Sequence, residues 1–483
     1  MRFTAGREAL GDAVAFVSRA LPSRPVVPLL SGMLLQAEAD AVTLSCFDYE
    51  VSARVRIDAE VGEPGTALVP GRLLAEITRS LPARPVEFSD DAEVVGITCG
   101  RAEFSLVCLP AGDYPRLPEV PAVVGTVDGG ALAAAIAQVA SSASRDDTLP
   151  MLTAVCVDVA GPVLTLAATD RYRLAAAELA FAPAEQGIRG LALVPARIMA
   201  DAARSMKAGV PVSIAFDVSG GGRAGPGGPA GPAGMPAREQ PHPAEGLISL
   251  ESAERRLTAR LIAGEFIRYR SRFPADFGCR ADLPAGPMIE AVRRTSLVAE
   301  RTAPIRLSFS SDHVVIEARA EGRARATEIV PAGYSGDQPA ISFNPQYLLD
   351  GLAAAAAAGA AAAANPDSSA ARPDTSDSEA AGGAAAGDGE GTSDVAAGGA
   401  EAGGDAGHIT LEFTSSAKPA LITWTRPGGS RARAADSAQD VDDAGAAAAG
   451  VPDSEHAAPE ADGPGSVPAF RYLLVPLRVP ERA

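Results

Sequence analysis

The chain has 483 residues, of which 47% are hydrophobic, so it can form about three domains of ordinary size. Its net charge of −18 is unevenly distributed, because residues 353–407 carry a net −8 and residues 427–467 a net −6. The rest of the chain is close to neutral, so the overall acidity does not exclude a nucleic-acid partner.

The five cysteines are odd in number and form no CxxC pair, a pattern typical of reduced, structural cysteines in a cytosolic protein. The start of the chain, MRFTAGREALGDAVAF, lacks the apolar core of a signal peptide. The most apolar run, at 351–364, is too short and too rich in alanine to span a bilayer. We therefore expect neither a secreted nor a membrane-spanning protein.

In chain order, the first predicted unit opens with a helix, since Leu10, Val14 and Val17 fall on one helical face. An alternating strand, EVSARVRIDA, follows at 50–59. The segment ALVPGRLLAEITRSL at 67–81 then predicts a short apolar strand, a proline near the first helical turn, and an amphipathic helix.

The second unit repeats the first at a nearly constant offset. Leu132, Ile136 and Val139 lie 122 positions after the helix residues above, and Asp170 lies 122 positions after Asp48. The segment ALVPARIMADAARSM at 192–206 corresponds to 67–81, and RLTARLIA at 256–263 again alternates as a strand does.

A third unit has the same order of elements, with a helix and strand in PMIEAVRRTSLVAERTAPIRLSF at 287–309 and a strand and helix in ISFNPQYLLDGLAA at 341–354. HITLEFTS at 408–415 is another alternating strand. The sequence therefore predicts an α+β fold with a threefold domain repeat and antiparallel sheets that have one solvated face.

Three low-complexity segments interrupt this pattern. Residues 218–246, 353–407 and 427–467 are rich in Gly, Pro, Ala, Ser or Asp, and we expect them to be disordered insertions. A fold tolerates such insertions because the entropy of loop closure grows only with the logarithm of length. We expect domains at 1–122, 123–274 and 275–483, with the first insertion in the second domain and the other two in the third.

Five motifs, in this order, resemble the bacterial DNA polymerase III β sliding clamps, of the actinobacterial type. They are SRPVVPLLSGMLL (23–35), RDDTLPMLTAV (145–155), ATDRYRLA (168–175), SFNPQYLLDGL (342–352) and YLLVPLRV (472–479). The resemblance implies three DNA-clamp domains per chain and a head-to-tail homodimeric ring, with helices lining the hole and antiparallel sheets outside. It also implies a cytoplasmic, nucleoid-associated processivity factor.

The partners implied are double-stranded DNA, bound without sequence preference, the clamp loader complex, and the catalytic subunit of DNA polymerase III. Other polymerases and repair proteins would bind through short peptide motifs. A clamp paralogue that acts only as an interaction scaffold, without a replicative role, remains the alternative.

By the same resemblance, twelve residues form the cleft that receives partner peptides. They are Leu152, Thr169, Arg171, Tyr172, Arg173, Leu174, Asn344, Tyr347, Val475, Pro476, Leu477 and Arg478. Apolar anchors with a few polar groups, rich in Arg and Tyr, are typical of such sites. Asp170 is better explained by a structural role, because it repeats Asp48, and Tyr347 has core packing as its alternative. The family pattern is broken at Ile267 and Thr302, which leaves one edge of the cleft undefined.

Basic residues repeat on the predicted helices. Arg72 and Arg79 lie seven apart on one helical face, and Arg197 and Arg204 are their counterparts in the second unit. The expected DNA-facing residues are Arg24, Arg72, Arg79, Arg197, Arg204 and Lys207. Further arginines lie on the first predicted helix of the first and third units: Arg7, Arg19, Arg293, Arg294 and Arg301. A solvated helix face is the alternative. The repeat of the pair favours phosphate attraction.

Catalytic chemistry is not indicated. None of the four histidines belongs to an HExxH or Cys/His cluster, and neither a GxxxxGK[ST] nor a GxSxG motif occurs. We therefore expect no enzyme activity, no cofactor and no metal site.

Overall fold

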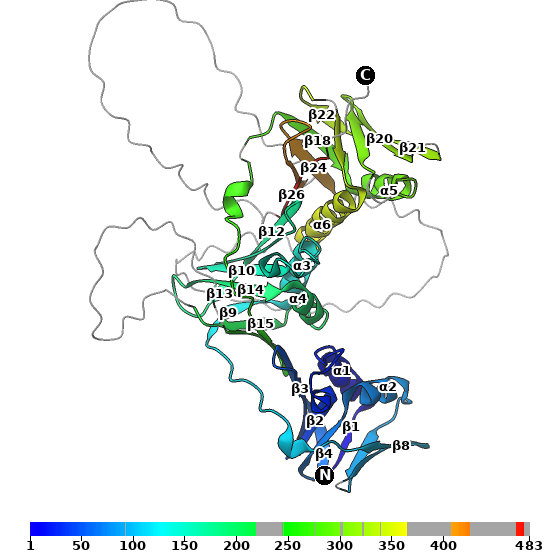
Figure 1. The fold of residues 1–483 in the computed structure, drawn as a ribbon, viewed down its shortest axis with the longest axis vertical. Coiled ribbons are helices and arrows are strands. Elements are labelled where there is room, and N and C mark those ends of the chain that lie inside the picture. The colour runs from blue at the N-terminus through cyan, green and yellow to red at the C-terminus, as the bar shows by residue number, and fades with distance from the viewer. Residues whose placement is uncertain are drawn as a thin grey trace, which may run out of the picture.

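The computed structural model describes residues 1–91, 93–218, 244, 246–274, 276–299, 303–320, 323–338, 340–364, 407–425 and 470–477. Three domains follow one another along its longest axis (Figure 1). Each consists of two helices and antiparallel strands, which confirms the predicted α+β fold with a threefold repeat.

The first domain contains two helices, α1 and α2, each preceded by a strand. Its elements are β1 (Arg2–Ala5), α1 (Arg7–Ser18), η1 (Pro28–Ser31), β2 (Gly32–Glu38), β3 (Ala41–Phe47), β4 (Val51–Glu63), β5 (Gly65–Pro70), α2 (Gly71–Ser80), β6 (Val86–Asp90), β7 (Val94–Cys99), β8 (Ala102–Val107) and η2 (Ala111–Asp113). The predicted helix residues Leu10, Val14 and Val17 all face the core and are fully or almost fully buried.

The second domain repeats this order. Its elements are β9 (Val123–Asp128), α3 (Gly129–Ala140), η3 (Pro150–Leu152), β10 (Ala154–Ala160), β11 (Val163–Thr169), β12 (Arg173–Ala180), β13 (Ala182–Pro183), β14 (Arg189–Pro195), α4 (Ala196–Ala203), β15 (Pro211–Phe216), β16 (Leu247–Ser252), β17 (Arg255–Arg260) and η4 (Arg270–Arg272). The carboxylate of Asp128 caps α3 by accepting the backbone N–H of Ala131 at 2.8 Å.

The third domain has the longest helix. Its elements are β18 (Cys279–Pro284), α5 (Ala285–Ser296), β19 (Ile305–Phe309), β20 (His313–Ala320), β21 (Ala324–Pro331), β22 (Gly333–Ser335), β23 (Ala340–Phe343), α6 (Pro345–Ala364), β24 (His408–Phe413), β25 (Ala420–Thr425) and β26 (Arg471–Leu474). Pro345 is the first residue of α6, whereas Pro70 and Pro195 are the residues before α2 and α4. Asn344 therefore corresponds to Pro70 and Pro195.

Backbone pairing carries the sheets across the domain boundaries. In the junction of the first and second domains, β17 pairs with β4, and Leu257 lies opposite Ala53. In the junction of the second and third domains, β26 pairs with β12, and Tyr472 lies opposite Ala175. The two junctions are thus built in the same way, and the helices follow one another from α2 at one end to α5 at the other (Figure 1).

The prediction of one solvated sheet face is wrong for β10 and β11, whose residues are nearly all buried. The segment that links the second and third domains covers their outer face. Phe266 and Tyr269 from this segment pack on Leu193 and Leu421 in a second apolar cluster. The Tyr269 hydroxyl donates to Asp158 at 2.7 Å, and burial, followed by that carboxylate, raises the pKa of Tyr269.

The prediction of disorder from residue 353 is also wrong, because α6 continues to Ala364. Alanine is the best helix former, and the buried Ala355 and Gly359 lie one turn apart on the face that packs inward. Val218, Ala244 and Gly246 are likewise ordered, and Ala244 donates its N–H to Leu191 at 2.6 Å. Gly407, at the end of the second predicted insertion, is also described, and the remaining parts of the three insertions, 219–243, 245, 365–406 and 427–467, lie outside the described residues.

We predict that Gly359→Ala destabilises the third domain by about 1–3 kcal/mol, although alanine is the better helix former. A Cβ at position 359 would overlap the indole of Trp424 on β25, the only tryptophan of the chain. The measurement is urea unfolding followed by Trp424 fluorescence. The matched control is Gly11→Ala in α1, where a Cβ meets nothing within 4 Å, so stability should rise by about 1 kcal/mol. A stabilised Gly359→Ala variant would contradict the packing.

Candidate functional site

The turn between β11 and β12 holds the sequence motif around Asp170. The Asp170 carboxylate accepts the backbone N–H groups of Tyr172 and Arg173, each at 3.0 Å. The Thr169 hydroxyl donates to the carbonyl of Arg173 at 2.7 Å and accepts the N–H of Arg171 at 3.2 Å. These bonds hold Arg171 at a φ of 81°, a left-handed conformation that a non-glycine residue adopts only when its surroundings impose it.

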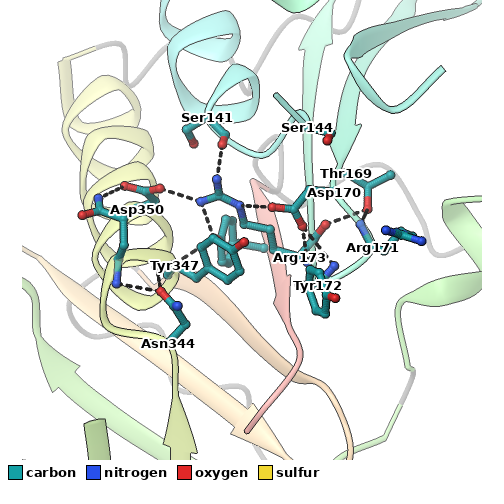
Figure 2. A network of polar contacts seen from close by, with 12 residues as sticks. Ser141, Ser144, Thr169, Asp170, Arg171, Tyr172, Arg173, Asn344, Tyr347 and Asp350 are labelled. Carbon is teal, nitrogen blue, oxygen red and sulfur yellow. Dashed lines mark hydrogen bonds and ion pairs between the residues drawn. The ribbon is translucent and has the colours of Figure 1, made fainter. Parts of the chain in front are cut away.

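Arg173 is the centre of a polar network across the junction of the second and third domains (Figure 2). Its guanidinium donates to Asp170 at 3.0 Å, to Asp350 at 2.5 Å, to the hydroxyl of Tyr472 at 3.5 Å and to the carbonyl of Ser141, and stacks 4.3 Å from the Tyr347 ring centre. Burial would lower the pKa of Arg173, but the tyrosine and carboxylate partners outweigh it, so the pKa is raised. The group is a permanent cation that ties two domains together.

The start of α6 presents Tyr347 to this network. The side-chain oxygen of Asn344 accepts the N–H groups of Gln346 at 3.0 Å and Tyr347 at 3.1 Å, and so caps the helix. The Tyr472 hydroxyl donates to the carbonyl of Tyr347 at 2.8 Å. Tyr347 is therefore half-buried between a cation and a neighbouring ring, and is neither a plain core residue nor a free one.

Two apolar side chains of the predicted site reach the surface. Tyr172 is 53% exposed and Val475 is 36% exposed, and Val475 donates its N–H to the carbonyl of Tyr172 at 2.9 Å. The Tyr172 ring lies 6.5 Å from that of Tyr347, with an angle of 30° between the planes. The pairing of β26 with β12 thus places Val475 next to Tyr172, at the tip of the hairpin formed by β11 and β12, although the two residues are about 300 positions apart in sequence.

Most of the other predicted members lie deeper, and Arg171 is the exception. Leu152, Thr169, Leu174 and Pro476 are buried, Leu477 is half-buried, and Arg171 is exposed. Leu174 belongs to the outer apolar cluster, against which Ile267 also packs. Arg478 and Thr302 lie outside the described residues.

The junction of the first and second domains offers an internal comparison, because it has the same backbone geometry. Arg260 donates its N–H to the carbonyl of Glu50 at 2.8 Å, as Val475 does to that of Tyr172. At this second place the exposed apolar pair is replaced by an ion pair, in which the Arg260 guanidinium lies 3.5 Å from the Glu50 carboxylate. The exposed pair of Tyr172 and Val475 is therefore specific to the junction of the second and third domains.

The same comparison distinguishes residues that both junctions share from residues found only at the junction of the second and third domains. Asp48 accepts the N–H groups of Glu50 and Val51, as Asp170 does in its own turn, so the structural role expected for Asp170 is confirmed. Leu30 and Leu152 are buried at matching positions. In contrast, Val51 stands where Arg173 stands. The network around Arg173 is an addition to the shared scaffold.

Sequence reasoning missed three members of this network: Ser141, Asp350 and Tyr472. Asp350 lies one turn after Tyr347 on α6, a spacing that could have suggested a shared face. Ser141 belongs to no motif, and Tyr472 opens the motif YLLVPLRV, but nothing in that motif indicates that its hydroxyl meets Arg173.

The predicted DNA-facing residues are all exposed. They comprise Arg24 in the loop after α1, Arg72 and Arg79 on α2, Arg197 on α4, Arg204 at the end of α4, and Lys207 beyond it. The predicted helix of the second unit thus stops earlier than expected, and Arg204 is its capping residue. Arg204 lies 3.7 Å from Asp201, a long contact for an ion pair.

The arginines of the first helices differ in their partners. Arg7 donates to the carbonyls of Leu81 and Arg79, each at 3.2 Å. Arg293 pairs with Glu290, and Arg294 lies 2.8 Å from Glu328. These two arginines are neutralised by nearby carboxylates, and Arg301 lies outside the described residues.

Among the described residues, no group of three or more His, Cys, Asp or Glu side chains is arranged to hold a metal ion. No helix in that part of the chain is long and apolar enough to cross a membrane.

Comparison with known proteins gives one family throughout. Profiles of the DNA polymerase III beta subunit match residues 1–118 with the N-terminal domain, 126–267 with the central domain and 270–363 with the C-terminal domain. The beta sliding clamp of Streptomyces coelicolor is 45% identical over 354 residues, which cover 73% of this chain and 88% of that protein.

Two further relatives bear on the alternatives. The beta sliding clamp homolog GriR of Streptomyces muensis is 40% identical over 352 residues, covering 73% of this chain and 88% of its own. A crystal structure of a Pseudomonas aeruginosa sliding clamp bound to griselimycin superposes with a TM-score of 0.68 at 22% identity, covering 99% of this chain and 100% of that one. At that identity the superposition shows the fold alone.

Proposed function

The chain belongs to the bacterial DNA polymerase III β subunits, the sliding clamps, and we propose that the surfaces described above perform the tasks of such a clamp. It encircles duplex DNA without sequence preference and tethers the replicative polymerase, which makes synthesis processive. The observation that supports this most is the threefold repeat, in which equivalent strand pairs join successive domains and the helices follow one another in a row from α2 to α5 (Figure 1).

The same repeat indicates which strands would pair between two copies of the chain to close a ring. The two junctions pair β17 with β4 and β26 with β12, and the strands at the equivalent positions of the third and first domains are β21 and β8. Each of these two has one edge without a partner strand in the described part of the chain. Val107 on β8 and Ile329 on β21 are 70% and 66% exposed. Pairing β8 with β21 of a second copy gives a closed, head-to-tail dimer with six similar domains.

Partner peptides bind at the junction of the second and third domains. Tyr172 and Val475 supply exposed apolar surface, and the Arg173 network fixes the hairpin tip beside them. Arg171, Thr169, Leu152, Leu174, Asn344 and Tyr347, with Pro476, Leu477 and Arg478, complete the proposed site. The partners are the catalytic subunit of DNA polymerase III, the clamp loader, other polymerases and repair proteins. Binding of griselimycin by the Pseudomonas aeruginosa clamp supports a peptide-like ligand.

The basic residues on the helix row hold the duplex loosely. Arg72, Arg79 and Arg197 are exposed on α2 and α4, and Arg24, Arg204 and Lys207 lie beside these helices. Contacts of this kind attract phosphates without reading sequence, and salt weakens them. A weak, sequence-independent contact permits sliding.

The protein works without catalysing a reaction and without a cofactor or metal. It acts on DNA inside the cell, in the cytoplasm and in association with the nucleoid. The proposed domain limits are 1–122, 123–274 and 275–483. The extents of the family matches, which end at 118 and 267 and resume at 126 and 270, support these limits.

We expect the protein, once loaded on nicked circular DNA by a clamp loader, to remain bound while the circle is closed and to dissociate when the circle is cut. A ring held by topology behaves in this way, because no surface contact has to break. The measurement is retention of labelled protein on circular and linearised DNA by gel filtration at physiological salt.

The control is Ile329→Lys, which places a charge on the free edge of β21 and should give monomers that are not retained. Val163→Lys is its match, since Val163 is an exposed valine away from both free edges. Retention that does not change when the circle is cut would favour binding by surface contacts alone.

The name of the Streptomyces muensis homolog supports a non-replicative paralogue as the second candidate, and failure to load would favour it.

A further inference from the structure

A basic cavity lies between α1 and the end of α4, where the first domain meets the second. It has a volume of about 180 Å³ and is lined by Arg19, Arg204, Lys207 and Arg255 together with one carboxylate, Asp12. A neighbouring cavity of about 360 Å³ shares Asp12, Lys207 and Arg255 with it, so the two form one groove along α1. Four cations from three separate parts of the chain thus surround a space that holds no side chain.

Little of this positive charge is neutralised. Arg255 lies 3.8 Å from Asp12, and Arg204 lies 3.7 Å from Asp201, distances at the long limit of an ion pair. Arg19 and Lys207 belong to none of the ion pairs between described residues. Arg255 is also held over the ring of Phe16, with its guanidinium carbon 5.7 Å from the ring centre.

The equivalent positions at the junction of the second and third domains show that the fold does not require this charge. Strand pairing and the helix starts relate Asp12, Arg19, Arg204 and Arg255 to Ala134, Ser141, Ala353 and Phe470. All four counterparts are uncharged, and there α3 packs directly on α6. The same architecture therefore has direct apolar helix packing at the junction of the second and third domains, and a basic groove at the junction of the first and second.

Resting on the function proposed above, we propose that this groove binds a backbone phosphate of the encircled duplex. Each subunit then holds DNA at the junction of its first and second domains and leaves it free at the next junction. A dimeric ring has two such holding points on opposite sides. Arg19 and Arg255 are phosphate-binding residues in addition to the exposed arginines of the helix row.

The test compares Arg19→Gln/Arg255→Gln with the control Arg256→Gln/Arg293→Gln, which removes the same charge. Arg256 and Arg293 are each paired with a carboxylate, Glu251 and Glu290, and line neither part of the groove. The readout is the slope of log binding constant against log salt concentration for a blunt linear duplex. Each lost phosphate contact should lower that slope by about 0.9. We expect a drop of about 1–2 for the groove variant and little change for the control.

A variant that is expected to bind the duplex more tightly rules out a folding defect as the cause of the weaker binding. Asp12→Asn removes the carboxylate that lines both cavities of the groove and should tighten duplex binding. Equal slopes for groove and control variants, or weaker binding by Asp12→Asn, would overturn the proposal. If inorganic phosphate raises the melting temperature of the wild type but not of the groove variant, while their duplex slopes agree, the groove holds a free anion and not DNA.

Retention on circular DNA is measured for every variant in parallel. A groove variant that is retained on the circle with a reduced slope supports the groove and leaves the ring function intact. Loss of retention in the wild type would instead contradict the function proposed above.

Discussion

Replacing Arg173 with methionine should lower the free energy of unfolding by about 3–5 kcal/mol. The side chain is buried, and its loss leaves the carboxylates of Asp170 and Asp350 without their cation in a poorly hydrated site. The carbonyl of Ser141 and the hydroxyl of Tyr472 lose a donor in the same step. Methionine fills a similar volume, so the loss reports the charge and not a cavity.

Urea unfolding followed by circular dichroism and Trp424 fluorescence measures this change. Arg171→Met is the matched control, because Arg171 is exposed on the same turn and its replacement should alter stability by less than about 0.5 kcal/mol. Arg173→Lys keeps the charge without the planar fork and should fall between the two. A loss below about 1 kcal/mol for Arg173→Met would mean that water reaches the two carboxylates and that the network does not bind the domains together.

Exchanging Tyr172 and Val475 for their counterparts at the other junction should reduce the affinity for partner peptides by roughly 100-fold or more. The double variant Tyr172→Glu/Val475→Arg recreates the Glu50–Arg260 ion pair on a backbone of the same geometry. It removes the exposed apolar pair and leaves every backbone hydrogen bond of the hairpin in place. The fold should therefore be kept while the binding surface is lost.

Fluorescence anisotropy with a labelled peptide from the polymerase catalytic subunit measures the affinity, and the melting temperature serves as the check on folding. The mirror variant Glu50→Tyr/Arg260→Val is the control, and its affinity should equal that of the wild type. Unchanged affinity in Tyr172→Glu/Val475→Arg would place the peptide site elsewhere. A gain of a second bound peptide in the mirror variant would show that the apolar pair alone is enough for binding.

The threefold repeat could be predicted from short sequence patterns because the turns and helix starts that define it depend only on neighbouring residues. Asp48 and Asp170 each cap their own turn, and Pro70 and Pro195 each precede a helix, so short stretches of sequence carry the whole signal. The helical alanines after Leu352 were not predictable, because their order depends on a distant part of the chain. Their packing depends on Trp424, which lies far along the chain and gives no sign of its partner Gly359.

The site was predictable only in part. The turn residues 169–173 form a motif, and the family resemblance added the C-terminal strand. The partners of Arg173 come from the C-terminal cap of α3, from α6 and from β26, and only the fold brings these elements together. The cover over β10 and β11 was missed because Phe266 and Tyr269 lie in a segment without helical or strand periodicity, where burial leaves no pattern.

The two junctions of the subunit differ in mechanical stiffness. Direct packing of α3 on α6 and the Arg173 network brace one of them, whereas cavities separate α1 from α4 at the other. An elastic body under load deforms where the fewest contacts resist, so bending is expected at the joint between the first and second domains. The second and third domains are then expected to move together as one rigid body. The first domain carries the free edge of β8, so we expect bending at this joint to move that edge relative to the other two domains.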